Sequence, residues 1–102
     1  MEKKMSFEDL IKSEKPVLID FFATWCGPCI AMGPILKEVA KDIGDKATIV
    51  KIDVDKNQEI AASYQVRGVP TMVLFQSGKQ LWRQSGVLSK DEIIRKIVEK
   101  TN

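Results

Sequence analysis

The feature that most constrains the fold is an apolar stretch, residues 17–23, that leads directly into a cysteine pair and then into a helical pattern. A nearly continuous apolar run of this length is typical of a β-strand buried on both faces. Beyond the cysteines, apolar residues recur at helical spacing until Gly44 ends the pattern. The sequence therefore predicts a strand, a turn that carries two thiols, and a helix.

The rest of the chain continues this alternation of helices and strands. The other predicted elements are a helix over residues 6–13, a strand over 47–53, a short helix over 57–64, a strand over 71–76, a hairpin strand over 80–85, and a terminal helix that begins with the capping box Ser89/Glu92. This order predicts an α/β fold with a mixed central sheet, parallel through its crossovers and antiparallel at the hairpin, with helices on both faces. We expect residues 1–102 to form a single domain.

Composition excludes several classes of function. The formal net charge of +2 is too small to favour a nucleic acid or an anionic membrane as partner. The chain has no histidine, which removes Ser-His and Cys-His nucleophile pairs and imidazole metal ligands. No run approaches the roughly 18 apolar residues of a membrane span, and the first residues are charged. We therefore expect a cytoplasmic protein, in a compartment where a purely structural disulfide is rare.

The two cysteines lie in the segment Trp25-Cys26-Gly27-Pro28-Cys29. If Cys26 ends the turn and Cys29 lies in the first helical turn, their Cβ atoms are about 5–6 Å apart and can close a disulfide. Free backbone N–H groups at the helix start would stabilise a Cys26 thiolate, and Cys29 would resolve a mixed disulfide. Pro28 suits the first turn, Gly27 permits close approach of another chain, and Trp25 would form an apolar collar.

Other sites that use cysteines fit less well. A structural zinc site normally needs four Cys or His ligands, and a c-type haem needs a histidine where Ile30 follows the second cysteine. Two unrelated buried cysteines stay an alternative, although the Gly-Pro insert argues against them. We expect no metal and no cofactor beyond a reversible Cys26–Cys29 disulfide.

From about Lys15 onward the chain resembles the thioredoxin family. The resemblance rests on the segments Asp20-Phe21-Phe22-Ala23-Thr24-Trp25-Cys26-Gly27-Pro28-Cys29, Lys51-Ile52-Asp53-Val54-Asp55, Val66-Arg67-Gly68-Val69-Pro70-Thr71, Ser77-Gly78, and Gly86 with Leu88-Ser89-Lys90. A WCGPC motif followed by a Gly-Val-Pro-Thr segment is a highly specific combination. The resemblance implies a thioredoxin fold and reversible dithiol–disulfide chemistry.

The resemblance also assigns roles to single residues. Cys26 matches the attacking thiol, Cys29 the resolving thiol, Asp20 the buried acid beneath them, Lys51 its neighbour, and Pro70 the cis-proline that faces the cysteines. An aspartate within an apolar strand should have a raised pKa and can accept the proton that the resolving thiol loses. The implied docking surface for an extended substrate consists of Trp25, Val54, Val69, Gly86 and Val87.

Three departures from the family pattern stand out. Ile30 occupies a position where many relatives carry lysine or arginine, which should weaken thiolate stabilisation slightly. Phe22 replaces a common tryptophan. The segment before the first predicted strand is short, so we expect the family's N-terminal edge strand to be short or absent.

Together with the cysteine pair, the resemblance implies a general protein-disulfide reductase, a monomer that acts on disulfide-containing proteins and is recycled by a thioredoxin reductase. Two alternatives stay open. The first is a disulfide oxidase or isomerase of the same fold, although Gly-Pro between the cysteines favours the reducing direction. The second is a binding subunit or scaffold in which the thiols are incidental.

Overall fold

The structure is a computed structural model, and it describes residues 6–101. Four strands form one sheet in the order β2-β1-β3-β4. Along the chain the elements are α1 (Phe7–Ile11), β1 (Val17–Phe22), α2 (Gly27–Ile43), the 3-10 turn η1 (Gly44–Lys46), β2 (Thr48–Asp53), α3 (Gln58–Ser63), β3 (Thr71–Gln76), β4 (Lys79–Ser85) and α4 (Lys90–Lys100). All predicted helices and strands are present, with bounds within two residues of those expected.

The sheet is mixed, as predicted, but one predicted strand direction is wrong. β1 pairs in parallel with β2, whereas β3 is antiparallel to β1 and to β4. The 17 residues of α2 extend about 25 Å, which is enough to carry the chain back along a strand of about 20 Å. The six residues of α3 extend only about 9 Å. The chain therefore re-enters the sheet at the end where β2 left it, and β3 runs in the opposite direction.

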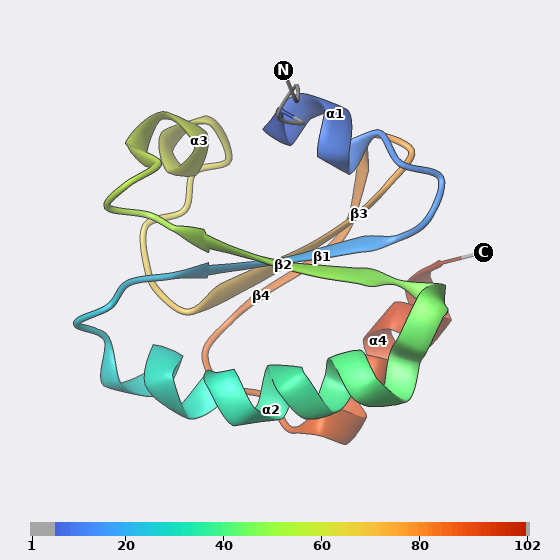
Figure 1. Ribbon diagram of the computed structural model, residues 1–102. Helices are drawn as coiled ribbons and strands as arrows, with labels where there is room; N and C mark the ends of the chain where they lie inside the picture. Colours follow the sequence, from blue (N-terminus) through green and yellow to red (C-terminus); the bar gives the residue numbers. More distant parts are fainter. Residues whose placement is uncertain (1–5, 102) are drawn as a thin grey trace, which may run out of the picture.

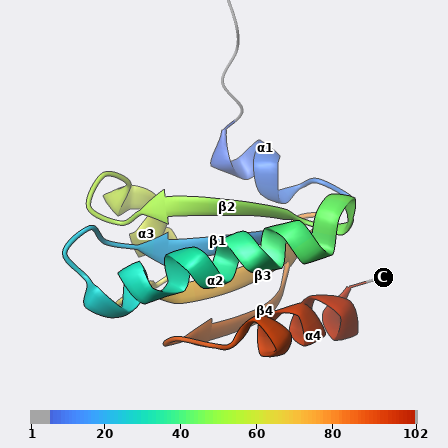
Figure 2. The ribbon, with the colours of Figure 1, turned by 60° about the horizontal axis from the view of Figure 1, so that its bottom comes forward.

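Helices cover both faces of the sheet, as predicted. Figure 1 shows α1 and α3 on one face and α2 and α4 on the other, and Figure 2 shows α2 extended across its face of the sheet. A buried cluster lies under each pair of helices. One contains Leu18, Met72 and Leu74 from the strands, and the other contains Ile19, Phe21 and Val73.

β1 is buried along almost its whole length, in agreement with the apolar pattern. Its side chains alternate between the faces: Leu18 packs beneath α2, while Ile19 and Phe21 pack against α1 and α3. By this alternation Asp20 points to the α2 face. The strand therefore places a carboxyl group beneath the helix that carries the cysteines.

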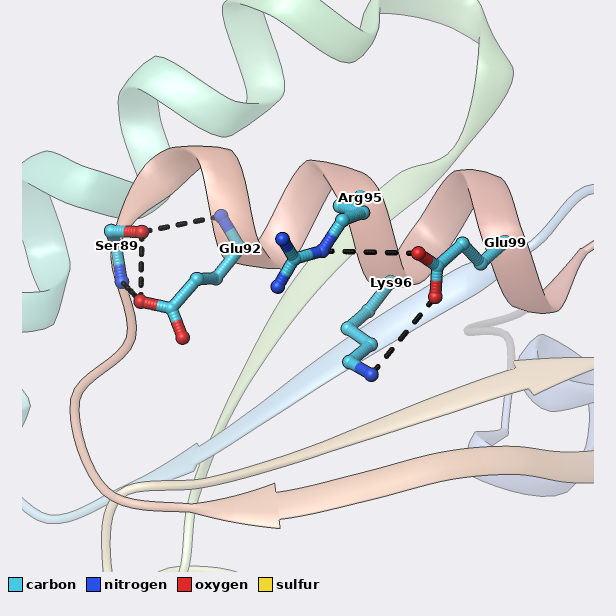
Figure 3. Close-up of polar contacts among 5 residues, drawn as sticks. All are labelled: Ser89, Glu92, Arg95, Lys96 and Glu99. Carbon is cyan, nitrogen blue, oxygen red and sulfur yellow. Dashed lines mark hydrogen bonds and ion pairs between the residues drawn. The ribbon is translucent and has the colours of Figure 1, made fainter.

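α4 begins with the predicted capping box (Figure 3). The Ser89 hydroxyl accepts from the Glu92 N–H at 3.2 Å, and the Glu92 carboxylate accepts from the Ser89 N–H at 3.4 Å. Near its other end, the exposed Arg95 and the half-buried Lys96 form ion pairs with Glu99. The helix is also joined to α2 by a pair between Lys90 and Asp42.

β2 forms one edge of the sheet, and within residues 6–101 no strand pairs with its outer side. The expected short or absent N-terminal strand would lie before α1, where residues 1–5 are outside the described part. In the same described range, no helix combines the length and the apolar content that a membrane crossing requires.

Candidate active site

The two cysteines lie where β1 turns into α2. Cys26 is the N-cap of α2, and its Sγ accepts a hydrogen bond from the Cys29 N–H at 3.1 Å. Cys29 lies in the first turn, and its Cα is 5.2 Å from that of Cys26. The two sulfurs form a disulfide. Pro28 occupies the first turn, where its missing N–H costs no helical hydrogen bond.

A loop from the other side of the site contacts the cysteines. Cys26 Sγ lies 3.6 Å from the carbonyl oxygen of Val69, and the Val69–Pro70 peptide bond is cis. Val54 and Val69 pack against the small buried cluster that contains both cysteines, each of which is only 4% exposed. Apolar side chains therefore pack around the disulfide.

Gly86 adjoins this loop from the end of β4. Its N–H donates to the Pro70 carbonyl at 2.9 Å, and its φ of 94° is a conformation that favours glycine. The next residue, Val87, is an exposed apolar side chain. The end of β4 thus borders the cis-proline.

Trp25 and Ile30 form an apolar rim beside the disulfide. Their side chains are 72% and 67% exposed, values that are high for large apolar residues. The Trp25 indole Nε1–H donates to Asp55 Oδ2 at 2.8 Å, which ties this side chain to the loop after β2. Asp55 was not among the predicted site residues. The signal was present, since Asp55 closes the Lys51-Ile52-Asp53-Val54-Asp55 segment of the family resemblance.

Asp20 and Lys51 are partners in the register of β1 and β2. Asp20 is fully buried, and neither of its carboxyl oxygens has a hydrogen-bond partner among the described residues. Burial raises the pKa of Asp20 from 3.8 to about 6, and the charge of Lys51 opposes this rise. The Lys51 Nζ lies 4.6 Å from the centroid of the Phe22 ring, and Lys51 is exposed to solvent. The strands therefore place beneath α2 a carboxyl group whose pKa is not far below neutral pH.

The family model named Thioredoxin matches residues 1–99. The chain belongs to the thioredoxin family. It is 50% identical over 93 residues to "Thioredoxin Y, chloroplastic" from Oryza sativa, which covers 90% of this chain and 55% of that protein. A solved structure of a mutant thioredoxin from Halobacterium salinarum has a TM-score of 0.86 and 38% identity, and covers 99% of this chain and 88% of the other.

The chain is also 46% identical over 89 residues to a protein from Mycobacterium leprae named "Bifunctional thioredoxin reductase/thioredoxin", covering 87% of this chain and 19% of that protein. Several curated relatives are thus much longer: the chain spans about half the length of the Oryza protein. The thioredoxin fold itself is shown by the Halobacterium structure, which matches nearly the whole chain.

The arrangement is suited to reversible disulfide chemistry within the protein itself. Two sulfurs that already form a disulfide can accept two electrons and become two thiols. Within residues 6–101, no group of three or more Cys, Asp or Glu side chains could hold a metal ion. The thioredoxin family works through such a cysteine pair and needs no added cofactor.

Proposed function

We propose that this thioredoxin-family chain is a general protein-disulfide reductase, with Cys26 as the attacking and Cys29 as the resolving thiol. The observation that carries the proposal is the position of Cys26 as the N-cap of α2, with the Cys29 N–H directed at its sulfur from 3.1 Å. In the dithiol form the same N–H and the positive end of the helix would stabilise a thiolate at Cys26.

The first step is attack of the Cys26 thiolate on one sulfur of a substrate disulfide. A bond forms between Cys26 Sγ and that sulfur, the substrate S–S bond breaks, and the other substrate sulfur leaves as a thiolate. The product is a mixed disulfide between the two proteins. Because Cys26 carries the anion and lies at the helix start, it is the better nucleophile of the pair.

The second step is attack by Cys29 on Cys26 Sγ, which forms the disulfide between them and releases the second substrate thiolate. Cys29 must first lose its proton. We assign Asp20 as the acceptor, directly or through water, because a carboxyl with a pKa of about 6 is ionised at neutral pH yet binds a proton readily. Lys51 would limit the rise of that pKa. Two electrons have then passed to the substrate.

The proposed docking surface is Trp25, Val54, Val69, Gly86 and Val87. Val54 and Val69 pack beside the disulfide, and Trp25 and Val87 are exposed apolar side chains. An extended substrate segment could pair with the Val69 backbone as an added strand, next to Pro70, which has no N–H. Such main-chain pairing would accept many sequences, as a general reductase requires.

A thioredoxin reductase is the proposed electron donor. The Mycobacterium leprae relative joins the two activities in its name, which supports this partner. We further propose that the chain acts as a monomer in the cytoplasm, with disulfide-containing proteins as substrates. The Oryza relative is named chloroplastic, so a plastid is the alternative compartment for relatives of this kind. Light scattering of the purified protein at micromolar concentration tests the monomer, and a dimeric mass would contradict it.

Reduction of insulin by dithiothreitol, followed by turbidity, tests the proposed activity. The wild-type protein should accelerate precipitation, and Cys26→Ser should reduce the rate to that of dithiothreitol alone. Equal rates for the two proteins would refute the proposal. Cys29→Ser should instead accumulate a mixed disulfide with the substrate through Cys26, visible as a shifted band under non-reducing conditions.

A binding function without thiol chemistry is the second candidate, favoured by the exposed Trp25 and Ile30 side chains. Complementation of cells that lack the protein separates the two functions. The double variant Cys26→Ser/Cys29→Ser should fail if exchange is required. Full restoration by that variant would establish the binding function. Equilibration with glutathione tests the oxidase alternative, since an oxidase would stay largely dithiol where a reductase stays disulfide.

A further inference from the structure

The loop that joins α3 to β3, residues 64–70, places the Val69 carbonyl against Cys26. The Val69 oxygen lies 3.6 Å from Cys26 Sγ. An extended chain that pairs with the Val69 backbone would therefore be positioned relative to the sulfur in part by this loop. What fixes the loop therefore bears on how protein substrates meet the thiol.

One end of the loop is fixed by Arg83, a half-buried residue of β4. Its Nη1 donates to the Tyr64 carbonyl, and its Nη2 donates to the Gln65 carbonyl at 2.7 Å. Arg83 is paired in register with Val73, whose side chain packs in the cluster beneath α1 and α3. The guanidinium therefore reaches the loop on the α3 face of the sheet.

The two carbonyls bound by Arg83 are those of Tyr64, the C-cap of α3, and of Gln65, the residue that follows it. The Val66 N–H donates to the Ala61 carbonyl and the Gln65 N–H to the Ala62 carbonyl, which is the Schellman pattern of a helix end. Gln65 has a φ of 54°, a left-handed conformation that is unfavourable for a residue with a Cβ. A forked, permanently charged donor is well matched to two successive carbonyls at the negative end of a helix.

The other end of the loop is fixed at the end of β4. The Thr71 hydroxyl donates a hydrogen bond to the Gly68 carbonyl at 2.7 Å, and it is also hydrogen-bonded to the Ser85 hydroxyl at 2.8 Å. The Gly86 N–H donates to the Pro70 carbonyl. β4 thus holds the loop at both ends, and the Val69 carbonyl lies between the two anchors.

We propose that Arg83 is a positioning residue for exchange with protein disulfides: it holds the 64–70 loop so that the Val69 backbone presents a bound chain to Cys26. This rests on the proposed function and adds a residue that touches neither the sulfurs nor the substrate. The rate of exchange with a small disulfide that makes no contact with the Val69 backbone should not depend on Arg83.

The experiment compares pre-reduced wild type with Arg83→Met and Arg83→Lys. Stopped-flow second-order rate constants are measured for insulin and for the small aromatic disulfide 5,5′-dithiobis(2-nitrobenzoate). For Arg83→Met the insulin rate should fall roughly tenfold, because modest misplacement of a bound chain is costly, while the small-disulfide rate should change by less than about twofold. Arg83→Lys keeps the charge but loses the two-pronged guanidinium donor, so its insulin rate should lie between those of the wild type and Arg83→Met. Arg95→Met, which removes an exposed guanidinium of α4, should change neither rate.

Equal losses with both disulfides, or no loss with either, would overturn the positioning role. A second readout is independent of activity: backbone order parameters of residues 66–69 from ¹⁵N relaxation should fall in Arg83→Met and stay unchanged in Arg95→Met. Unchanged order parameters in Arg83→Met would also overturn the role. If the wild type reduced the small disulfide but not insulin, the proposed reductase function would fail, and the order parameters would still decide whether Arg83 anchors the loop.

Discussion

Asp20 is a carboxyl group that β1 holds out of contact with water and, within the described residues, without a hydrogen-bond donor. Its presence in an apolar strand could be read from the sequence, and so could the direction of its pKa shift, because burial disfavours the charged form. The size of the pKa shift could not be predicted from the sequence, since it depends on how completely Asp20 is buried and on Lys51, its partner in the register of β1 and β2.

The raised pKa of Asp20 predicts a dependence of stability on pH. The folded pKa of about 6 exceeds the ordinary value of 3.8, so the folded state binds more protons than the unfolded state between these pH values. The contribution of Asp20 to the free energy of unfolding therefore falls as pH rises from about 4 to about 6, and is constant above. One pKa unit is worth about 1.4 kcal/mol, so the total is about 3 kcal/mol.

Asp20→Asn removes this titration. In urea unfolding of the disulfide form, the free energy of unfolding of Asp20→Asn should exceed that of the wild type by about 3 kcal/mol at pH 7.5. The two values should be equal near pH 3.5. The exposed carboxylate of Asp45 provides the control, and Asp45→Asn should show no such trend. A constant difference between Asp20→Asn and wild type across this range would contradict the assigned pKa.

The hydrogen bond between Trp25 and Asp55 was not predicted, because it joins residues 30 positions apart whose approach depends on the turn after β2. We expect Asp55→Ala to release the indole and to slow insulin reduction by roughly two- to tenfold, the equivalent of one exposed hydrogen bond. Trp25→Phe has no N–H, so adding Asp55→Ala to Trp25→Phe should have no further effect. Additive losses in this double-mutant cycle would contradict coupling through the hydrogen bond.

At the scale of helices and strands, the sequence predicted the elements well and one connection poorly. Periodicity and caps located α2 and α4, and the turn residues Ser77 and Gly78 located the hairpin. The direction of β3 was predicted wrongly, because the prediction rested on the alternation of helices and strands and not on the length of α3, which is too short to return the chain along the sheet. Arg83 was not among the predicted site residues, because it donates to backbone carbonyls, and backbone carbonyls leave no signature in the sequence.

The capping box of α4 offers a prediction at this scale. Ser89→Ala removes the side-chain acceptor of the Glu92 N–H, and should lower the free energy of unfolding by about 1 kcal/mol. Arg95→Met removes an exposed ion pair with Glu99, in which the charged atoms are 3.8 Å apart, and should change the free energy of unfolding by less than about 0.5 kcal/mol. Chemical denaturation measures both. A larger effect for Arg95→Met than for Ser89→Ala would contradict this ranking.

For the whole molecule, the fold and the redox site are largely separate. The two main buried clusters lie beneath the helix pairs on either face of the sheet and contain neither cysteine. The cysteines belong to a third, smaller cluster at one end of the sheet, with Ala23 as its other buried member. Burial of apolar area in the main clusters should therefore maintain the fold without the disulfide.

This separation predicts that the double variant Cys26→Ser/Cys29→Ser folds but does not catalyse exchange. A disulfide that closes a loop of four residues restricts the unfolded chain by about 2 kcal/mol, so the variant should be less stable than the disulfide form by about that amount. Urea unfolding with circular dichroism measures this loss, and the reduced wild-type protein is the matched control. Loss of cooperative unfolding in the variant would show that the small cysteine cluster is needed for the fold, because both main clusters keep all their side chains in this variant.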